Sequence, residues 1–380
     1  MRCGRSIVSV ARRFRVARST VRYWLARAGR MRLDRVEWSD RPRGPCLPGN
    51  KTSLELEDLV LRLRRELKDT SALGEFGAAA ILRELEHRHV DKPPSLRTIG
   101  RILERRGALD GRKRIRRPPP PRGWYLLDVA AGHAELDCFD IIEGMVIQGG
   151  HAVEALTGTS LHGGLVATWV QQTITAKIAV RALVEHWRCF GLPAYAQFDN
   201  DTIFQGAHHH PDSIGRVSRL CLALGIVPVF TPPQETGFQA AIENFNGRWE
   251  AKVWNRFRHH SRQALRRRSD RFITAHRRRA AARIEAAPHR EPFPVNWQLD
   301  LQAELQGCLV FLRRTTAKGG VTVLGHTLSV DHHWPNRLVR AEVDLTERCI
   351  RFYALRRREP TYQPLLKQVP YEFPQRRFHE

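Results

Sequence analysis

Long apolar runs and paired cysteines are both missing from this sequence of 380 residues. No stretch of about 18 consecutive apolar residues occurs, and no signal peptide precedes a small-residue cleavage site, so the sequence predicts neither a membrane span nor secretion. The 7 cysteines are scattered without a CxxC pair, which argues against a disulfide framework and against a zinc site. We therefore expect an intracellular, cytoplasmic protein without a membrane partner.

Acidic residues are also scarce. Lys and Arg number 63 against 39 Asp and Glu, for a formal net charge of +24. Such an excess predicts association with a polyanion, and nucleic acid is the usual one. The acids are unevenly distributed, however, because residues 124–255 hold 7 Lys and Arg but 13 Asp and Glu. An acidic segment inside a basic chain would repel DNA unless a cation were bound within it.

The N-terminal third of the chain predicts two helical units. Residues 1–50 carry two short helical patterns that meet near Phe14, the layout of a helix-turn-helix, whose second helix enters the major groove of DNA. A packed amphipathic hairpin without DNA contacts is the alternative. Residues 51–110 repeat the helical pattern and predict a second DNA-binding unit. On the second helix of the first unit, we expect the DNA contacts to come from Arg18, Ser19, Thr20 and Arg22.

A linker and three further segments follow. Residues 111–123 contain four consecutive prolines, which favour an extended spacer. Residues 124–255 read as a strand meander followed by alternating helices and strands, which predicts a mixed sheet with helices on its faces. Residues 256–300 predict an Arg-rich helical arm, and residues 301–380 predict a small β-barrel with a tail. Basic residues of the linker are expected to follow DNA phosphates: Arg112, Lys113, Arg114, Arg116 and Arg117.

Three acids of the central segment stand on separate predicted elements. The stretch AYAQFDNDTIF at 194–204 places Asp199 and then Asp201 at the end of a buried strand. Asp137 lies in the first strand of the segment, and Glu243 lies on a later helix. Carboxylates that converge in a site of low dielectric constant repel one another unless a divalent cation neutralises them. Two Mg²⁺ ions held in this way stabilise displacement at phosphorus.

Four motifs of this segment resemble the DDE transposases and retroviral-type integrases, whose core has a ribonuclease-H-like fold. They are LDCFD, QFDNDTIFQG, LGIVPVFTPP and GFQAAIENFNGRW, and the likeness covers about residues 120–255. The upstream helical units and the C-terminal barrel also resemble bacterial insertion-sequence members of the family. The resemblance implies a multidomain α/β protein: helix-turn-helix units, a ribonuclease-H-like mixed-sheet core and a small C-terminal β-barrel.

The resemblance also implies a site and a reaction. Asp137, Asp199 and Glu243 are the expected catalytic and metal-binding residues, with Asp140 as the alternative to Asp137. Glu235 and Glu250 are the alternatives to Glu243, and Asp201 supports the site without binding metal. We expect two Mg²⁺ ions, replaceable by Mn²⁺, with 3′-end cleavage followed by strand transfer of a mobile element.

The partners implied are double-stranded DNA, as element ends and as target, and further copies of the chain assembled on it. A bacterial, nucleoid-associated location would follow. On the helix of Glu243, Arg248 and Lys252 are expected to contact DNA.

Three other functions remain open at the level of the sequence. An inactive DNA-binding relic or regulator would retain the basic units but give the acids no task. A metal nuclease of the same fold would cleave without joining. A serine or tyrosine recombinase would attack through a side chain such as Ser160 or Tyr195, but neither has a recognisable cluster of arginine and histidine around it.

Overall fold

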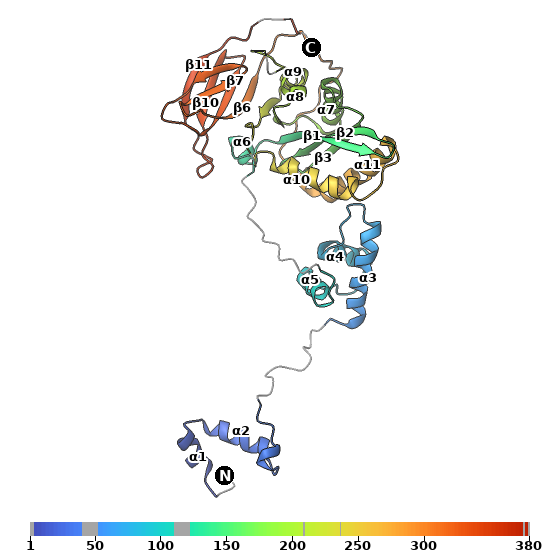
Figure 1. The fold of residues 1–380 in the computed structure, drawn as a ribbon, viewed down its shortest axis with the longest axis vertical. Coiled ribbons are helices and arrows are strands. Elements are labelled where there is room, and N and C mark those ends of the chain that lie inside the picture. The colour runs from blue at the N-terminus through green and yellow to red at the C-terminus, as the bar shows by residue number, and fades with distance from the viewer. Residues whose placement is uncertain are drawn as a thin grey trace. The chain divides into compact units, whose positions relative to one another are not determined.

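The chain forms two compact units, Met1–Glu57 and Asp58–Glu380 (Figure 1). This computed structural model describes residues 4–39, 52–109, 122–207, 210–235, 237–374 and 377–378. The linker residues expected to contact phosphate, Arg112, Lys113, Arg114, Arg116 and Arg117, lie outside the described residues. No helix within the described ranges has the length and apolar character needed to cross a membrane.

The first unit contains the expected pair of short helices, α1 (Ile7–Phe14) and α2 (Arg18–Ala28), followed by a 3₁₀ turn at Leu33–Arg35. Ser6 caps α1 by accepting a hydrogen bond of 3.2 Å from the backbone N–H of Ser9. Arg15, at φ 51°, ends α1 in a left-handed conformation, and the chain reverses there. The four residues at the start of α2 that were expected to contact DNA are all exposed: Arg18, Ser19, Thr20 and Arg22. The DNA contacts themselves remain a prediction.

Three helices follow: α3 (Leu54–Thr70), α4 (Ala78–His87) and α5 (Leu96–Arg105). Each presents one apolar face, and α4 contacts α5. Ser95 caps α5 as its position predicts, because its hydroxyl accepts a hydrogen bond of 3.3 Å from Thr98 N. The fully buried side chains of the three helices include Val60, Leu63, Ile81, Leu85 and Ile99.

A mixed sheet of nine strands forms the rest of the molecule, in the order β11-β10-β9-β6-β5-β4-β1-β2-β3. Strands β1, β2 and β3 form an antiparallel meander, and β1, β4, β5 and β6 run parallel to one another. Strands β9, β10 and β11 complete the sheet in antiparallel pairs. The bounds are β1 Leu136–Ile147, β2 His151–Ser160, β3 Val166–Gln171, β4 Tyr195–Phe198, β5 Val227–Phe230, β6 Cys308–Arg314, β9 Leu338–Asp344, β10 Cys349–Ala354 and β11 Leu365–Pro370.

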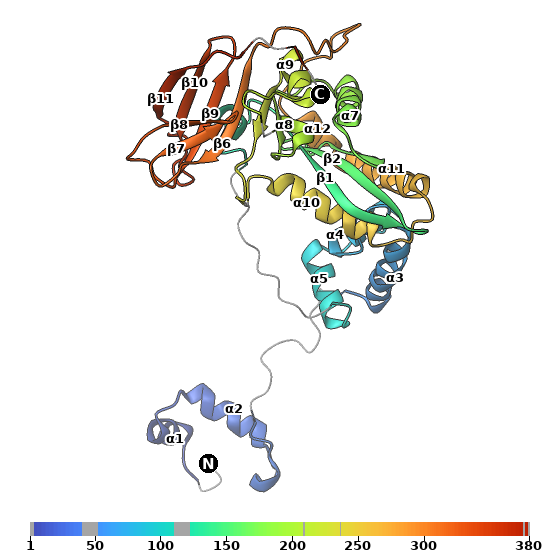
Figure 2. The same ribbon diagram turned by 45° about the horizontal axis from the view of Figure 1, so that its top comes forward.

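Helices cover both faces of the part of this sheet formed by β1–β5 (Figures 1 and 2). One face packs against α7 (Ala176–Phe190), the short α8 (Thr202–Gln205), α9 (Arg216–Ala223) and the hairpin of β7 (Gly320–Val323) and β8 (His326–Ser329). The opposite face packs against α10 (Ala240–Trp249), its π-helical continuation Glu250–Trp254, and α11 (Arg262–Arg279). Short helices α6 (Leu127–Ala130) and α12 (Ala281–Glu285) precede β1 and follow α11. The mixed sheet with helices on both faces is compatible with the expected ribonuclease-H-like core.

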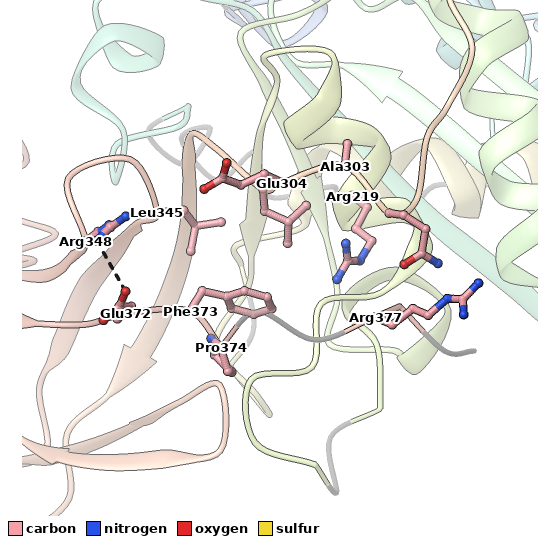
Figure 3. Close-up of a pocket in the computed structure, with 11 residues that line it drawn as sticks. Arg219, Ala303, Glu304, Leu345, Arg348, Glu372, Phe373, Pro374 and Arg377 are labelled. Carbon is pink, nitrogen blue, oxygen red and sulfur yellow. Dashed lines mark hydrogen bonds and ion pairs between the residues drawn. The ribbon is translucent and has the colours of Figure 1, made fainter.

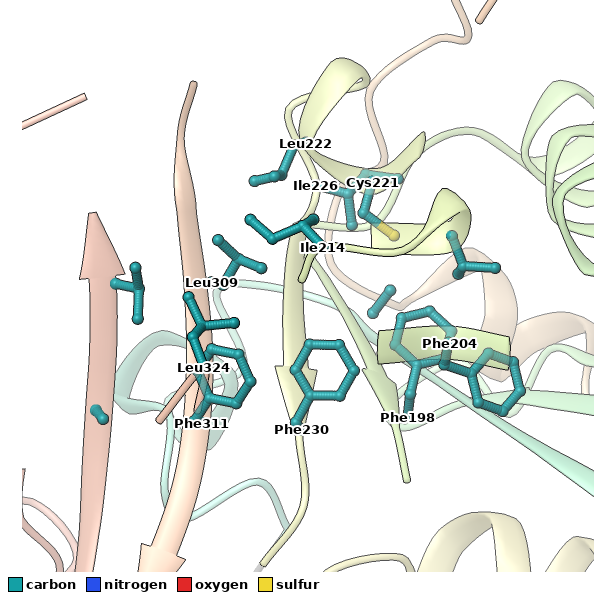
Figure 4. Close-up of a cluster of buried hydrophobic side chains, with 14 of the residues drawn as sticks. Phe198, Phe204, Ile214, Cys221, Leu222, Ile226, Phe230, Leu309, Phe311 and Leu324 are labelled. Atoms are coloured by element: carbon teal, nitrogen blue, oxygen red, sulfur yellow. The ribbon is translucent and has the colours of Figure 1, made fainter. Parts of the chain in front are cut away.

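The C-terminal strands differ from the separate small barrel expected over residues 301–380. Val310 and Phe311 of β6 pair in parallel with Val229 and Phe230 of β5, so these strands continue the central sheet. The physical reason is shared burial: the rings of Phe230 and Phe311 stack with centroids 5.1 Å apart, beside Phe198 on β4 (Figure 4). Strand β6 thus buries both its faces as a central strand does.

The Arg-rich segment is likewise packed against the core and does not project as an arm. Leu265, Phe272 and Ile273 of α11 are buried, and α11 contacts β3. Trp249 of α10 donates a hydrogen bond of 2.8 Å to the Ser269 hydroxyl on α11. The many arginines of the segment made the apolar face of Leu265, Phe272 and Ile273 hard to recognise in the sequence.

Candidate active site

Asp140 and Asp199 end on neighbouring parallel strands. Strand β1 pairs with β4 so that Asp137 lies opposite Ala196 and Cys138 lies opposite Gln197. Continuing this register places Asp140 level with Asp199, the first residue after β4. Both side chains are half-buried.

Helix α10 brings the third acid toward this edge of the sheet. Its Asn246 donates a hydrogen bond of 2.8 Å to Oδ2 of Asp140. Glu243 stands three residues earlier, in the first turn of the same helix, and is exposed. Residues three apart share one helical face, so the Asn246 contact turns Glu243 toward the same carboxylate.

The charges of these three acids interact. Burial of Asp140 and the negative charges of Asp199 and Glu243 raise the pKa of Asp140 to about 6, although hydrogen bonds from Ile141 N and Asn246 oppose the shift. A carboxylate normally titrates near pH 4. The raised pKa of Asp140 therefore reflects first its burial and then two carboxylates from other elements, which lie within the range in which like charges repel.

Asp137, the first-strand acid expected in the catalytic set, does not lie with Asp199 and Glu243. Its carboxylate is buried and accepts hydrogen bonds of 2.9 and 2.6 Å from Arg290, and a third of 3.1 Å from the Trp187 indole. Burial alone would raise the pKa of Asp137, but the Arg290 charge and hydrogen bonds outweigh it and lower the pKa. This carboxylate is engaged in an ion pair with Arg290, whereas Asp140, the alternative offered by the sequence, interacts with Asp199 and Glu243.

The geometry of a strand explains why Asp137 and Asp140 face different helices. Successive side chains of a strand point to opposite faces, so residues three apart lie on different sides of the sheet. Asp137 faces α7, where Trp187 lies, and Asp140 faces α10, where Asn246 lies. The sequence motif LDCFD offers both acids, and only the position of α10 distinguishes them.

The remaining acidic candidates have other partners. Glu235 forms an ion pair with Arg314, and Glu250 lies in the π-helical turn after α10. Asp201 caps α8 by accepting a hydrogen bond of 2.7 Å from Ile203 N. Its own backbone N–H donates to Asp199 Oδ1 over 3.0 Å, so Asp201 supports the loop that carries Asp199.

Several polar residues around the acids were not singled out by the sequence. The Thr157 hydroxyl donates a hydrogen bond of 2.8 Å to Asn246 Oδ1, which orients the amide toward Asp140. Gln197 of β4 accepts a hydrogen bond from the Tyr125 hydroxyl and donates one of 3.0 Å to the backbone oxygen of Phe238, just before α10. Thr157 and Gln197 are completely buried, and a polar residue within an apolar strand pattern is the signal that could have identified them.

The donor set of the site suits a hard divalent cation. Asp140, Asp199 and Glu243 supply only carboxylate oxygens, the ligands that Mg²⁺ and Mn²⁺ favour, and a cation would relieve their mutual repulsion. In the described part of the chain, no three His, Cys, Asp or Glu side chains are arranged so that they could hold a metal ion. Two of the acids are turned to protein partners instead: Asp140 to Asn246, and Asp199 to Asp201 N.

Basic residues line a groove beside α10. A cavity of about 430 Å³ is lined by Arg122, Arg248 and Arg283 together with Asn244 of α10. An adjoining cavity of about 260 Å³ shares Arg248 and adds Lys252 and Arg279. Burial and the neighbouring arginines lower the pKa of His276, which lines both, to about 4. Arg248, a residue expected to contact DNA, is exposed here, whereas Lys252 donates a hydrogen bond of 3.1 Å to Gly74 O.

A further cavity, like the two beside α10, has none of Asp140, Asp199 and Glu243 in its lining. It has a volume of about 510 Å³ and lies between α9 and the C-terminal strands (Figure 3). Its charged residues are of both signs: Arg219, Arg348 and Arg377 against Glu304 and Glu372. Arg348 and Glu372 form an ion pair of 3.4 Å there.

Part of this chain is similar in structure to retroviral integrases. The HTLV-2 integrase catalytic core domain in complex with magnesium matches 32% of this chain and 70% of its own, at 13% identity and a TM-score of 0.25. The BIV integrase catalytic core domain matches 38% of this chain and 82% of its own, at 15% identity and a TM-score of 0.28. The simian T-cell lymphotropic virus intasome chain matches 80% of this chain and 95% of its own, at 13% identity and a TM-score of 0.32. No protein-family model and no curated protein matches the sequence.

Proposed function

We propose that this chain is a metal-dependent DNA transposase or integrase that cleaves 3′ ends and joins them to target DNA. The observation that supports the proposal most directly is that Asp140 of β1, Asp199 at the end of β4 and Glu243 of α10 lie close enough for their charges to interact. Asn246 links α10 to Asp140 over 2.8 Å, and burial together with the charges of Asp199 and Glu243 raises the pKa of Asp140.

The three acids would hold Mg²⁺, or Mn²⁺ in its place, as one or two ions. When bound, the metal supplies positive charge for the phosphate oxygens and lowers the pKa of a water molecule. The chain's own residues perform the rest. Asn246 and Thr157 fix the Asp140 carboxylate, and Asp201 N fixes Oδ1 of Asp199. In this arrangement no side chain acts as nucleophile: water attacks first, and the freed 3′-hydroxyl attacks the target phosphate.

Binding of double-stranded DNA is proposed for two regions. The exposed start of α2, with Arg18, Ser19, Thr20 and Arg22, fits the major groove of an element end. The groove beside α10, with Arg122, Arg248 and Arg283, fits the phosphates of the strand being cut. Holding two element ends and a target requires several copies of the chain, so we propose a homo-multimer on DNA, in a bacterial nucleoid.

A cleavage and joining assay tests the proposal. Duplexes taken from the DNA on either side of the chain's own reading frame serve as substrate, with Mg²⁺, Mn²⁺ or Ca²⁺. We expect joined products from the wild type with Mg²⁺ or Mn²⁺ and none from Asp199→Asn, which should still bind the DNA. Cleavage without joining would identify a nuclease, and binding without any reaction would identify an inactive relic; either result rejects the transposase.

A further inference from the structure

Two consecutive arginines end strand β6 beside the loops that carry the acidic residues. We propose that Arg313 and Arg314 are positioning residues of the active site, and that the C-terminal strands thereby form part of the catalytic unit. The inference rests on the proposed function for its rate measurements, but its structural prediction is measured without any reaction.

Arg313 bridges the ends of β4 and β5. Its guanidinium donates hydrogen bonds of 2.9 Å to Asn200 Oδ1 and 3.1 Å to Thr231 O. The Asn200 amide donates a further bond of 2.7 Å to the same Thr231 oxygen. Asn200 directly follows Asp199, so this triangle fixes the backbone from which the Asp199 side chain projects.

The environment of Arg313 makes the bridge rigid. Burial lowers the pKa of Arg313 to about 10, and the guanidinium remains charged at neutral pH. The planar guanidinium of a buried arginine loses little conformational freedom when it donates to two acceptors at once. A shorter side chain, or one with a single donor group, does not replace it. Because β6 lies next to β5 in the sheet, the guanidinium of Arg313 is within hydrogen-bonding distance of Asn200 and Thr231.

Arg314 holds the loop between β5 and α10. Its guanidinium forms an ion pair with Glu235 of that loop and donates a hydrogen bond of 2.5 Å to Asn336 O. Glu235 lies eight residues before Glu243, in the segment that leads from β5 to α10. Arg314 therefore acts on the acid carried by α10, as Arg313 acts on the acid that follows β4.

A third contact connects the same strands to the site. Arg340 of β9 donates a hydrogen bond of 2.9 Å to Tyr125 O. The Tyr125 hydroxyl in turn donates to Gln197 of β4, which binds Phe238 O at the start of α10. The C-terminal strands thus bind the residue after Asp199 directly and are linked to β4 and to the start of α10 through Tyr125 and Gln197, and a detachable DNA-binding module would have no such contacts.

Hydrogen exchange and single-turnover joining test Arg313. In Arg313→Gln we expect amide exchange around Asn200 to accelerate at least fivefold, and the joining rate at saturating DNA to fall at least tenfold with the DNA Kd changed less than twofold. The matched control is Arg351→Gln, because Arg351 pairs with Asp344 over 3.1 Å within the C-terminal strands. We expect the control to leave both the Asn200 exchange and the joining rate unchanged.

A double-mutant cycle separates positioning from general stability. Because Arg313 acts through Asn200, Asn200→Ala should slow joining as much as Arg313→Gln does, and the double variant should be no slower. Additive losses would overturn the proposal. Asn200→Ala also replaces Arg313→Gln as the test variant if the arginine substitution prevents folding.

Charge exchange tests Arg314. Arg314→Glu should accelerate exchange around Glu235 at least fivefold, and Arg314→Glu with Glu235→Arg should restore the wild-type exchange. No restoration would overturn this half of the proposal. If the wild type joins no DNA, the proposed function fails, yet the exchange measurements on Arg313 and Arg314 still decide whether the two loops are held by β6.

Discussion

Asp137 and Asp140 lie three positions apart on β1 and reach opposite faces of the sheet. Asp137 is buried against Arg290, with two hydrogen bonds of 2.9 and 2.6 Å. Asp140 is bound by Asn246 of α10 over 2.8 Å and is repelled by two other carboxylates. Two acids in one short motif therefore have opposite electrostatic surroundings. Replacing each of them by asparagine should change the stability of the fold in opposite directions.

Asp137→Asn should destabilise the fold. The substitution leaves the buried Arg290 guanidinium without its counter-charge, and breaking one partner of a buried pair costs about 3–5 kcal/mol. We expect urea unfolding to show a free energy of unfolding lower by this amount, with the midpoint at a correspondingly lower urea concentration. The corresponding exposed-pair control, Arg348→Gln, removes a bond to Glu372 between two largely exposed side chains and should change the free energy of unfolding by less than about 1 kcal/mol. Equal effects would contradict the role of Asp137.

Asp140→Asn should stabilise the fold while abolishing the reaction. The pKa of Asp140 is raised to about 6 in the folded chain, so folding favours its protonated form. The stability it contributes is full below pH 4 and is lost as the pH rises through 6. An asparagine does not ionise, so at pH 8 without divalent ions we expect a gain of about 1–2 kcal/mol in the free energy of unfolding.

Added Mn²⁺ provides a second measurement on the same variant. Binding to the folded state alone raises the thermal midpoint of the wild type in proportion to the logarithm of the metal concentration. Asp140→Asn should lack this rise, and Asp137→Asn should keep it. A rise retained in Asp140→Asn and lost in Asp137→Asn would restore the acid first expected from the sequence.

Asn246→Ala should move the pH dependence of the reaction. The amide hydrogen bond lowers the pKa of Asp140 against the other causes, so its removal raises that pKa above 6. The wild-type rate is expected to fall as the pH drops through about 6, and the variant rate should fall at a higher pH, with a loss of about twofold at pH 7 and a smaller loss at pH 8. Thr157→Val should shift the pH dependence of the rate in the same direction by a smaller amount. A uniform loss at every pH would show that Asn246 acts only on stability.

Sequence reasoning predicted the mixed sheet of the core, and it offered all three acids, Asp199 and Glu243 as first choices and Asp140 as an alternative. Asp199 follows an apolar strand and Glu243 stands on an amphipathic helix, and both are local signals. The choice between Asp137 and Asp140 depends on which face α10 covers, and that packing is not encoded within β1. The joining of β6 to β5 is also non-local, because 77 residues separate the end of β5 at Phe230 from the start of β6 at Cys308. Glycine turns predicted short strands correctly but gave no information on their neighbours.

The arginines of the two proposed DNA-binding regions should differ in their effect on affinity and on rate. Arg18→Ala with Arg22→Ala removes two exposed cations from α2, and each lost phosphate contact reduces the slope of log K against log salt by about 1. We expect weaker binding of the duplex, with the joining rate at saturating DNA preserved. Arg248→Ala, in the groove that Arg122 and Arg283 also line, should reduce the slope by about 1 and slow joining as well, because this cation lies on the helix of Glu243. Binding titrations between 50 and 200 mM salt, followed by single-turnover assays, measure both quantities. Identical losses of joining rate in the two variants would contradict this difference and would indicate that the arginines of α2 and Arg248 belong to one DNA-binding surface.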